Sequence, residues 1–340
     1  MSFLSVCIAN YNGEDIIGEC IDSVRAQTSA LNVQIIVHDD ASEDDSVALI
    51  KSAYPDVKLI VSDSNVGYCV ANNRMVNAAD GDWVLLLNND ACLFEDAVET
   101  ICRLQSERPD AGVIGLRQFD LETGAIVDTG CGLDIFHNPV PLVGPRKSDD
   151  VAMIIGACLA VSKSVWETAG GFPEWFHAIA EDMYLCCATR LVGLKVTVPA
   201  TSGYLHRQGV SYGGNRPDQG RLKTTTRRRY FSERNKLSVL ITTFPTIMMW
   251  PLLFLHCATL IAEGGLLSVL KRSPAIFRSI YAAAVYWQWK RRAVLLKTRK
   301  RLMRRGHVGL LEYLSAFSWR IRKLDMLWRF GVPEIRSRQK

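Results

Sequence analysis

The sequence lacks several patterns that mark common classes of protein. None of its ten cysteines is spaced C-x-x-C, and only Cys186 and Cys187 lie close together, so we expect reduced thiols and neither a zinc ribbon nor a disulfide framework. It contains no G-x-G-x-x-G and no G-x-x-x-x-G-K-S/T segment, which argues against phosphate binding by a glycine-rich loop. Its start, MSFLSVCIAN, has no basic segment and predicts a first core strand rather than a signal peptide.

Acidic residues are scarce in the last third of the chain. Residues 1–220 contain 14 Lys and Arg against 30 Asp and Glu, whereas residues 221–340 contain 26 against 5. A basic segment favours an anionic surface, which means nucleic acid or acidic lipid. Residues 237–262 contain no Asp, Glu, Lys or Arg and are long enough to cross a bilayer as a helix, although Pro245 and Pro251 interrupt them.

This apolar run leaves several interpretations open. It is compatible with a membrane-embedded or re-entrant hairpin, with a helix lying in the membrane interface, and with a buried pair of helices. Nucleic-acid binding explains the basic residues but not the adjacent apolar ones. We therefore predict a helical, basic, membrane-associating region over residues 231–340 and no nucleic-acid partner.

Apolar strands alternate with helical patterns over the first 110 residues. Nearly continuous apolar strands separated by helices predict an α/β domain over residues 1–230, with a mostly parallel sheet covered on both faces. Ligands of such sheets bind outside the carboxyl ends of the strands. The expected strands cover residues 3–9, 33–40, 57–62 and 82–90, and the expected helices cover residues 13–27, 42–54, 71–79 and 183–191.

Polar side chains follow several of these strands at the point where each ends. The clusters are Asn10-Tyr11-Asn12, Asp39-Asp40 and Asn88-Asn89-Asp90. Mg²⁺ typically takes one or two protein carboxylates together with substrate phosphates, and Asp90 suits that role. Asn88 lies two residues earlier and points to the same side of an extended segment. The alternative is that residues 88–90 are simply a turn after a strand.

The order of these motifs resembles that of a known enzyme family. The segments SVCIANYN, IIVHDDASEDDS, NVGYCVANN, WVLLLNND, GACLAVSK, GGFPEWF and EDMYLCCATRLVGLKV cover about residues 1–210 in the order of family 2 glycosyltransferases of the GT-A fold. Within that family the chain looks most like the bacterial rhamnosyltransferase-type branch. The resemblance implies a GT-A fold and an inverting hexosyltransferase.

The resemblance also assigns residues to the nucleotide sugar. Asp39 matches the family's acid that hydrogen-bonds the pyrimidine base, and residues of the first loop would touch base or ribose. The N-x-G turn and the following helix start would line the pocket of the sugar and its phosphates. The residues implied in nucleotide-sugar binding are Ala9, Tyr11, Asn12, Asp39, Asn65, Gly67, Asn73 and Asn89.

The metal site implied by the resemblance is centred on NND, which stands where the family has a D-x-D-like motif. Asp90 would be the main ligand of Mg²⁺ or Mn²⁺, and Asn88 replaces the first acid of the motif. His206 in LHRQGVSYGG matches a histidine that lies near the diphosphate in many relatives. The resemblance therefore implies the metal ligands Asp90, Asn88 and His206.

The pair Glu181-Asp182 matches the family's ED motif. Asp182 would be the general base that takes the proton from the acceptor hydroxyl, and a single displacement would invert the anomeric centre. The family often has EDxDL here, whereas this chain has EDMYL, with Tyr184 in place of the second Asp. Glu181, Trp175 and Tyr184 would lie on the acceptor side.

The resemblance implies transfer of rhamnose or another hexose from a dTDP- or UDP-sugar to a saccharide. A lipid-linked acceptor at the cytoplasmic face of the bacterial plasma membrane, in cell-surface polysaccharide biosynthesis, would account for the apolar and basic last third. Two alternatives differ in class. A sugar nucleotidylyltransferase usually has a glycine- and arginine-rich loop after its first strand, where this chain has ANYNGED. A non-catalytic nucleotide-binding module needs neither Asp90 nor Asp182.

Overall fold

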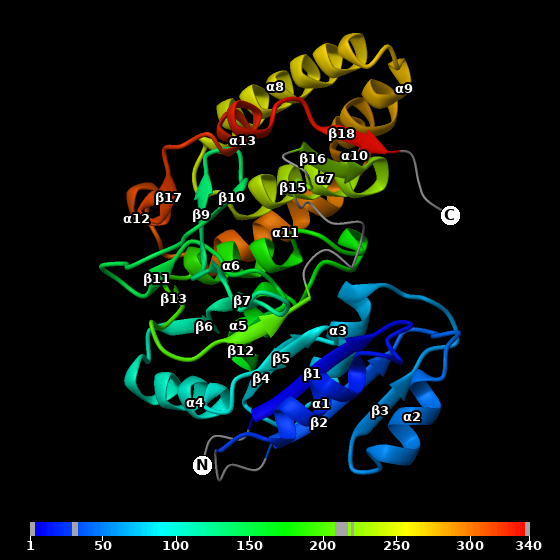
Figure 1. Cartoon of the computed structure of the whole chain (residues 1–340). Helices are drawn as coiled ribbons and strands as arrows, with labels where there is room; N and C mark the ends of the chain where they lie inside the picture. Colours follow the sequence, from blue (N-terminus) through cyan, green and yellow to red (C-terminus); the bar gives the residue numbers. More distant parts are fainter. Residues whose placement is uncertain (1–3, 29–32, 208–216, 219–220, 337–340) are drawn as a thin grey trace. The chain divides into compact units, whose positions relative to one another are not determined.

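The computed structural model describes residues 4–28, 33–207, 217–218 and 221–336 (Figure 1). The chain forms two compact units. Unit 1 comprises Met1–Cys131 and Pro141–Arg207, and unit 2 comprises Gly132–Val140 and Gln208–Lys340. This division comes after Arg207, whereas the sequence places the boundary after residue 230.

Unit 1 is built on an eight-stranded, mainly parallel sheet with the order β11-β13-β6-β12-β4-β1-β2-β3. β12 runs antiparallel to both of its neighbours, and β11 runs antiparallel to β13. The four strands expected in the first 90 residues are all present. The strands are β1 Leu4–Asn10, β2 Val33–Asp39, β3 Lys58–Val61, β4 Trp83–Asn88, β6 Ala111–Gly115, β11 Asp150–Val151, β12 Cys158–Ser162 and β13 Lys195–Thr197.

Helices cover both faces of this sheet, as the apolar strands predict. Leu4, Val6 and Ile8 of β1 share one buried cluster with residues of α1, α2 and α4. The intervening Cys7 is equally buried and points to the opposite face, because side chains alternate along a strand. α3 packs against β1 and β2 as well. The helices are α1 Ile17–Arg25, α2 Ser46–Ala53, α3 Tyr68–Ala78, α4 Ala97–Glu107, α5 Lys163–Ala169 and α6 Glu181–Leu191.

A second, smaller sheet in unit 1 lies outside the elements that the sequence predicts. Its strands follow the order β5-β14-β7-β8 and have three residues each. It joins the segment after β4 to the end of unit 1, because β5 pairs antiparallel with β14. The strands are β5 Ala91–Leu93, β7 Gln118–Asp120, β8 Ile126–Asp128 and β14 Tyr204–His206.

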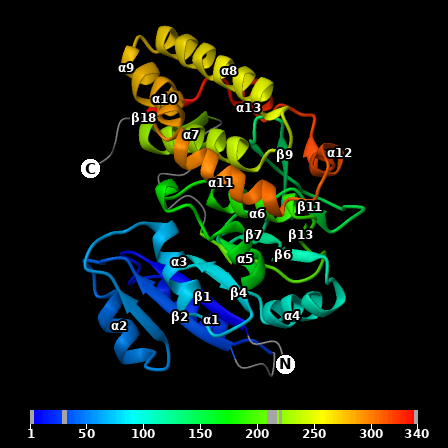
Figure 2. The same cartoon turned by 180° about the vertical axis from the view of Figure 1, so that it is seen from behind.

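Unit 2 is mainly helical and is organised around α7 (Figure 2). α7 packs against α8, α10, α11 and the π-helical segment Phe277–Ala282. Its helices are α7 Thr226–Thr243, α8 Met249–Leu270, α9 Pro274–Ile276, α10 Ala283–Lys290, α11 Arg292–Arg305, α12 Leu310–Leu314 and α13 Arg322–Phe330. Its short strands are β9 Cys131–Asp134, β10 Pro139–Pro141, β15 Pro217–Asp218, β16 Arg221–Thr225, β17 Phe317–Ser318 and β18 Glu334–Arg336.

The apolar run of residues 237–262 is divided between two helices. Its first part, residues 237–243, is buried in α7, and the helix ends two residues before Pro245, which has no N–H to donate. Pro251 lies in the first turn of α8, where proline is tolerated. By length and composition, α8 is long and apolar enough to cross a membrane, and 22% of its most apolar window is buried. The buried-helix interpretation therefore describes the first part of the run and not the second.

Candidate active site

The polar ends of three neighbouring strands meet at one edge of the large sheet. Asn10 at the end of β1 lies opposite Asp39 at the end of β2. On the other side of β1, Ala9 lies opposite Asn88 at the end of β4. These strands are parallel, so all three reach this edge with their carboxyl ends, which is where open α/β sheets bind ligands.

Asp39 is held at this edge by a hydrogen-bonded network. Its carboxylate is fully buried and accepts from Asn10 Nδ2 at 2.9 Å and from Ser42 Oγ at 2.6 Å. Asn10 Oδ1 in turn accepts from Asn89 Nδ2 at 2.8 Å. A Cβ atom at Gly13 would lie 2.2 Å from Asn10 Oδ1, so this network requires glycine there. Asn10, which the sequence places in a polar cluster without a specific role, connects Asp39 to Asn89.

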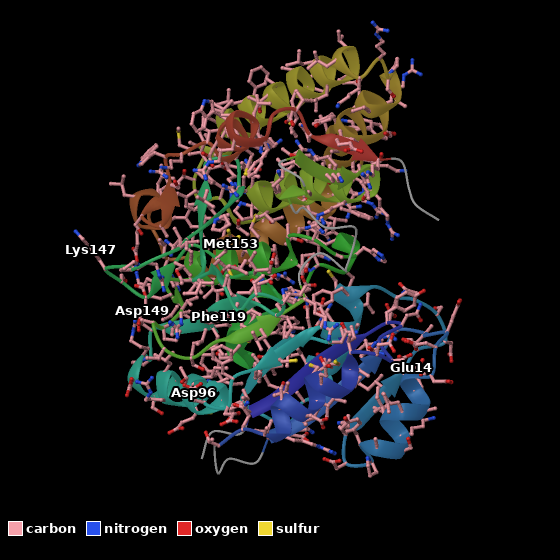
Figure 3. All side chains as sticks on the ribbon, viewed as in Figure 1. Glu14, Asp96, Phe119, Lys147, Asp149 and Met153 are labelled. Atoms are coloured by element: carbon pink, nitrogen blue, oxygen red, sulfur yellow. The ribbon has the colours of Figure 1, made fainter. Side chains whose placement is uncertain are left out.

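The loop after β1 and the loop after β2 are tied together beside this network. Asn12 N donates to Ser42 Oγ at 2.9 Å, and Asn12 Oδ1 accepts from Glu43 N at 2.8 Å. Glu14, labelled in Figure 3, donates its backbone N–H to Asp44. Tyr11 is 48% exposed between these contacts. The two loops thus form one surface on which Tyr11 is accessible.

The N-x-G turn is anchored by the acid next to Asp39. Asp40 accepts from Val66 N at 2.7 Å and from Gly67 N at 2.8 Å. Gly67 has φ of +89°, and a Cβ atom there would lie 2.3 Å from His177 Nδ1, so two constraints favour glycine. Asn65 is exposed at the start of the turn.

Asn73 joins α3 to the loop that contains Trp175. Its amide donates to Phe172 O at 3.0 Å and accepts from Phe172 N at 2.9 Å. In that loop the half-buried Trp175 packs edge-to-face on Phe176, with 4.6 Å between ring centroids. The side chain of Asn73 therefore orients the loop in which Trp175 lies.

Asp90 and His206 come together from distant parts of the sequence. The register of β5 and β14 places His206 opposite Ala91, the residue after Asp90. His206 Nε2 lies 3.1 Å from Asp90 Oδ1, and the two side chains are 13% and 3% exposed. Two of the three predicted metal ligands are therefore in contact.

This pair fits one side of a divalent-cation site. Two ligand atoms that share an octahedral ion at 2.0–2.1 Å are separated by about 3 Å, which matches the 3.1 Å between Asp90 Oδ1 and His206 Nε2. The described residues contain no group of three His, Cys, Asp or Glu side chains able to hold a metal. The remaining ligands would have to come from substrate phosphates and water, as is usual for Mg²⁺.

The third predicted ligand, Asn88, belongs to a different chain of contacts. The Tyr68 hydroxyl lies 3.2 Å from Asn88 Oδ1 and 3.1 Å from Gly156 O. Gly156 N donates to Asp182 Oδ2 at 2.9 Å, and Met183 N donates to Asp182 Oδ1 at 2.6 Å. Tyr68 and Gly156 thus connect the NND segment to the predicted base.

Tyr68 is a site residue that sequence reasoning missed. Burial raises the pKa of its phenol, and the charges of Glu181 and Asp182 raise it further. The phenol therefore remains a hydrogen-bond donor throughout the ordinary pH range. Tyr68 directly follows the N-x-G turn, and nothing in the local sequence pattern distinguishes it from an aromatic residue of the core.

Asp128 is a second residue that the sequence did not indicate. It is 3% exposed, and its Oδ1 accepts from Gly130 N at 2.9 Å. Within the part of the chain that the structure describes, Asp128 Oδ2 and His206 Nδ1 are buried without hydrogen-bond partners. Burial raises the pKa of Asp128 to about 6, although His206 acts in the opposite direction. The carboxylate therefore lies within electrostatic reach of the Asp90–His206 pair.

The segment that precedes α6 has an unusual backbone. Three of its non-glycine residues have positive φ, and Ala180, immediately before Glu181, is left-handed with φ of 69° and ψ of 12°. Such conformations cost about 1–3 kcal/mol each and cluster at functional sites. The other two residues are His177 and Ile179.

Tyr184 lies in the interior of unit 1. Its side chain is fully buried, and its hydroxyl donates to Ala169 O at 2.8 Å. Glu181, at 7% exposed, begins α6 beside Asp182. Of the predicted acceptor-side residues, Trp175 is the most accessible, while Tyr184 is part of the core.

His206 is the last predicted site residue that can be placed. Arg207, which follows it, donates its backbone N–H to Asp90 O at 3.0 Å, and its guanidinium binds Glu19. The rest of the LHRQGVSYGG motif, from Gln208 to Gly214, lies outside the described residues.

Two family models match the chain. The model described as glycosyl transferase family 2 matches residues 5–129, and that described as glycosyl transferase family group 2 matches residues 83–290. The second match alone covers more than half of the chain and includes NND, the ED pair and His206.

Several curated bacterial proteins are similar over parts of the chain. The O-antigen biosynthesis protein RfbC of Myxococcus xanthus is 23% identical over 61% of this chain and 17% of its own length. The succinoglycan biosynthesis protein ExoO of Rhizobium meliloti is 38% identical over 31% of this chain and 29% of its own length. The N-acetylglucosaminyl-diphospho-decaprenol L-rhamnosyltransferase of Mycobacterium tuberculosis is 25% identical over 53% of this chain and 68% of its own length. The chain thus spans well under half of the first two relatives.

Solved structures share the fold at low identity. GalNAc-T7 with UDP, GalNAc and Mn²⁺ has a TM-score of 0.58 and 16% identity, covering 71% of this chain and 48% of that one. The mannosyltransferase PcManGT of Pyrobaculum calidifontis with GDP-Man and Mn²⁺ has a TM-score of 0.53 and 16% identity, covering 96% and 87%. S. aureus TarS 1–349 with UDP-GlcNAc has a TM-score of 0.53 and 15% identity, covering 94% and 93%.

These matches favour neither alternative raised by the sequence, the sugar nucleotidylyltransferase or the non-catalytic module. The family models cover the strands and loops that form the site, and the solved structures have the same α/β architecture. The chain is therefore a member of glycosyltransferase family 2, an enzyme with the GT-A fold.

Proposed function

We propose that this enzyme transfers rhamnose or another hexose from a dTDP- or UDP-sugar to a saccharide, with inversion of the anomeric centre. The observation that supports this most is the chain of contacts from Asn88 through Tyr68 and Gly156 to Asp182. These contacts connect the NND segment, whose Asp90 contacts His206, to a carboxylate suited to act as a base. The named activity of the mycobacterial relative supports rhamnose as the sugar.

The donor would bind across the loops after β1 and β2. Asp39 would take the pyrimidine base, and Ala9, Tyr11 and Asn12 would contact base or ribose. The exposure of Tyr11 is compatible with this role. Asn65, Gly67, Asn73 and Asn89 would line the sugar-phosphate side. Two structural neighbours were solved with UDP-GlcNAc or GDP-Man, which supports a nucleotide sugar as donor.

The diphosphate would be bound beside Asp90 and His206 together with a divalent cation, Mg²⁺ or Mn²⁺. When bound, such a cation neutralises the charge that develops on a departing diphosphate. Asp90 and His206 would hold it, and Asn88 would add a neutral amide oxygen. Mn²⁺ is present in two of the structural neighbours, which supports this assignment.

Asp182 would act as the general base. The backbone N–H groups of Gly156 and Met183 each occupy one of its carboxylate oxygens and fix its orientation. A carboxylate accepts hydrogen bonds at both of its oxygens, as a base that receives a hydroxyl proton must. The base takes the hydroxyl proton while the acceptor oxygen bonds to the anomeric carbon. The bond from that carbon to the diphosphate breaks, and the nucleoside diphosphate leaves.

The acceptor would be a saccharide, and we propose that it is linked to a lipid at the cytoplasmic face of the bacterial plasma membrane. Glu181 and Trp175 would lie beside it, whereas the buried Tyr184 would support α6 from inside. Relatives named for O-antigen and succinoglycan biosynthesis support a role in cell-surface polysaccharide assembly. Unit 2 would associate with the membrane surface.

The donor and the metal can be tested together. Purified enzyme would be incubated with a panel of dTDP-, UDP- and GDP-sugars and a lipid extract that contains acceptor, and release of nucleoside diphosphate would be measured. We expect release with a dTDP- or UDP-sugar, loss of release with a chelator, and recovery on addition of Mg²⁺ or Mn²⁺. Transfer that is insensitive to chelation would contradict the role of Asp90 and His206.

A further inference from the structure

One side of α8 carries a continuous row of exposed apolar side chains. Trp250, Phe254, Ile261, Leu266 and Val269 are 53%, 77%, 40%, 60% and 75% exposed. Successive members are three to seven residues apart, and they lie on the side of the helix away from its buried residues. Figure 3 shows side chains projecting from α8 away from the rest of unit 2.

α13 adds a second exposed apolar row beside the first. Leu324, Leu327 and Trp328 are 59%, 48% and 86% exposed. Lys323 of α13 forms an ion pair with Glu263 of α8 at 2.7 Å, so the two helices are in contact. We call the exposed apolar rows of these two helices the α8–α13 face. Soluble monomers rarely leave apolar patches of this extent uncovered.

The opposite side of α8 belongs to the interior of unit 2. His256, Leu260, Gly264 and Leu267 are buried, and the helix packs against α7, α9 and the segment Phe277–Ala282. Glu263 on this side also binds Arg229 of α7. A helix that crossed a bilayer would have to separate from these ion pairs or carry them into hydrocarbon, which is costly. This packing favours a helix lying along a membrane over one that spans it.

The charges around the α8–α13 face are basic. Lys271 and Arg272 are exposed at the end of α8, and Arg320 and Arg329 are exposed at the two ends of α13. Glu263 and Asp325, the acids of these helices, are each paired with two basic side chains, and Arg329 is one of the two that bind Asp325, so basic side chains outnumber acidic ones around the face. An apolar row bordered by Lys and Arg matches the interface of an anionic leaflet.

We propose that the α8–α13 face is a monotopic docking surface for an anionic lipid bilayer. The apolar rows enter the headgroup and acyl boundary, while Lys271, Arg272, Arg320 and Arg329 remain at the level of the lipid phosphates. Trp250 and Trp328 suit that depth, because indole rings favour the boundary between hydrocarbon and water. The proposal rests on the membrane-bound acceptor of the proposed function and specifies how the enzyme reaches it.

The test uses the full chain and vesicles of phosphatidylcholine with or without phosphatidylglycerol. We expect co-sedimentation that increases with phosphatidylglycerol and decreases with salt. The double variant Phe254→Glu/Val269→Glu should bind at least tenfold more weakly than the wild type. Val143→Glu replaces a valine of unit 1 that is 68% exposed, and it should bind as the wild type does.

Three results would overturn the proposal. The first is unchanged vesicle binding by the double variant. The second is wild-type protein that stays with membranes after extraction at alkaline pH, which would indicate a spanning helix. The third is a lipid-free wild type that sediments as a dimer while the double variant is a monomer, which would assign the face to a second copy of the chain.

The proposal of a docking surface and the proposal of glycosyl transfer can be tested separately. A water-soluble saccharide acceptor reports transfer without any membrane. If the double variant loses vesicle binding and still releases nucleoside diphosphate with the soluble acceptor, the docking surface is supported and the chemistry is intact. If no nucleotide sugar is consumed by the wild type, the proposed function fails whatever the result with vesicles.

Discussion

Single residues at the candidate active site are constrained by contacts from several directions. Asn88, Asn89 and Asp90 are consecutive, yet their side chains contact Tyr68, Asn10 and His206, respectively. Each of these partners lies on a different element. Such divergence explains why a strand that is buried along its length ends in three polar side chains, since each connects the strand end to another part of the site.

Asp128 offers a test of the electrostatics of this site. Burial raises its pKa to about 6, so the folded state binds a proton more tightly than the unfolded state does. Its contribution favours folding at low pH and is lost as the pH rises through about 6. With chelator present, we expect Asp128→Asn to be more stable than the wild type above pH 6, by about 3 kcal/mol at most, with a smaller advantage near pH 4.

Thermal unfolding measured from pH 4 to pH 8 checks this expectation. Asp63→Asn is the matched control, because Asp63 is exposed and its substitution should leave the difference between the two pH extremes unchanged. A stability gain for Asp128→Asn that is equal at pH 4 and pH 8 would contradict the assignment of a buried, destabilising charge.

At the scale of elements, the segment directly before α6 and Asp182 has a strained backbone. Ala180 is left-handed, a conformation that costs an alanine about 1 kcal/mol relative to glycine. We expect Ala180→Gly to melt about 2–4 °C above the corresponding glycine variant at Ala178, because both variants lose a buried methyl group and only Ala180→Gly relieves this strain. Differential scanning calorimetry would measure the shift.

Ala178 supplies the matched control in the same segment. It is 4% exposed and is not among the residues with positive φ, so Ala178→Gly removes a buried methyl group without relieving strain. This variant should melt below the wild type. If both glycine variants lower the melting temperature equally, the backbone of Ala180 is not strained.

The elements that the sequence predicts well are the ones with strong periodicity. β1, β2, β3 and β4 are apolar runs that end in polar residues, and the helices between them have amphipathic spacing. The second sheet was not predicted, because β5, β7, β8 and β14 have three residues each and show no period. Asp128 was missed for the same reason, since it lies at the end of β8.

Some residues of the site are predicted only by the resemblance to a family, because propensity and spacing do not indicate that they lie close together. Asp90 and His206 are separated by 116 residues, and only the pairing of β5 with β14 places them in contact. Tyr68 and Asn10, by contrast, lie inside quoted motifs, but the resemblance assigns neither of them a role. Their roles come from hydrogen bonds formed in the folded state, which depend on register and side-chain direction rather than on local pattern.

At the scale of the whole molecule, the chain combines an acidic N-terminal part with a basic C-terminal part. The acidic residues of the candidate active site, Asp39, Asp90 and Asp182, lie in unit 1. The basic residues that border the α8–α13 face lie in unit 2. This separation of charge is compatible with the proposal that unit 1 binds a metal-associated diphosphate and that unit 2 attaches to an anionic surface.

Whether Asp182 is the general base is tested most sharply by the activity of Asp182→Asn. The asparagine is nearly isosteric but cannot accept the acceptor's proton, so transfer should fall by a factor of about 10²–10⁴ while the affinity for the nucleotide sugar stays close to that of the wild type. Asp63→Asn should retain full activity. Full transfer activity in Asp182→Asn, measured as release of nucleoside diphosphate with acceptor present, would contradict the assignment of Asp182 as the general base.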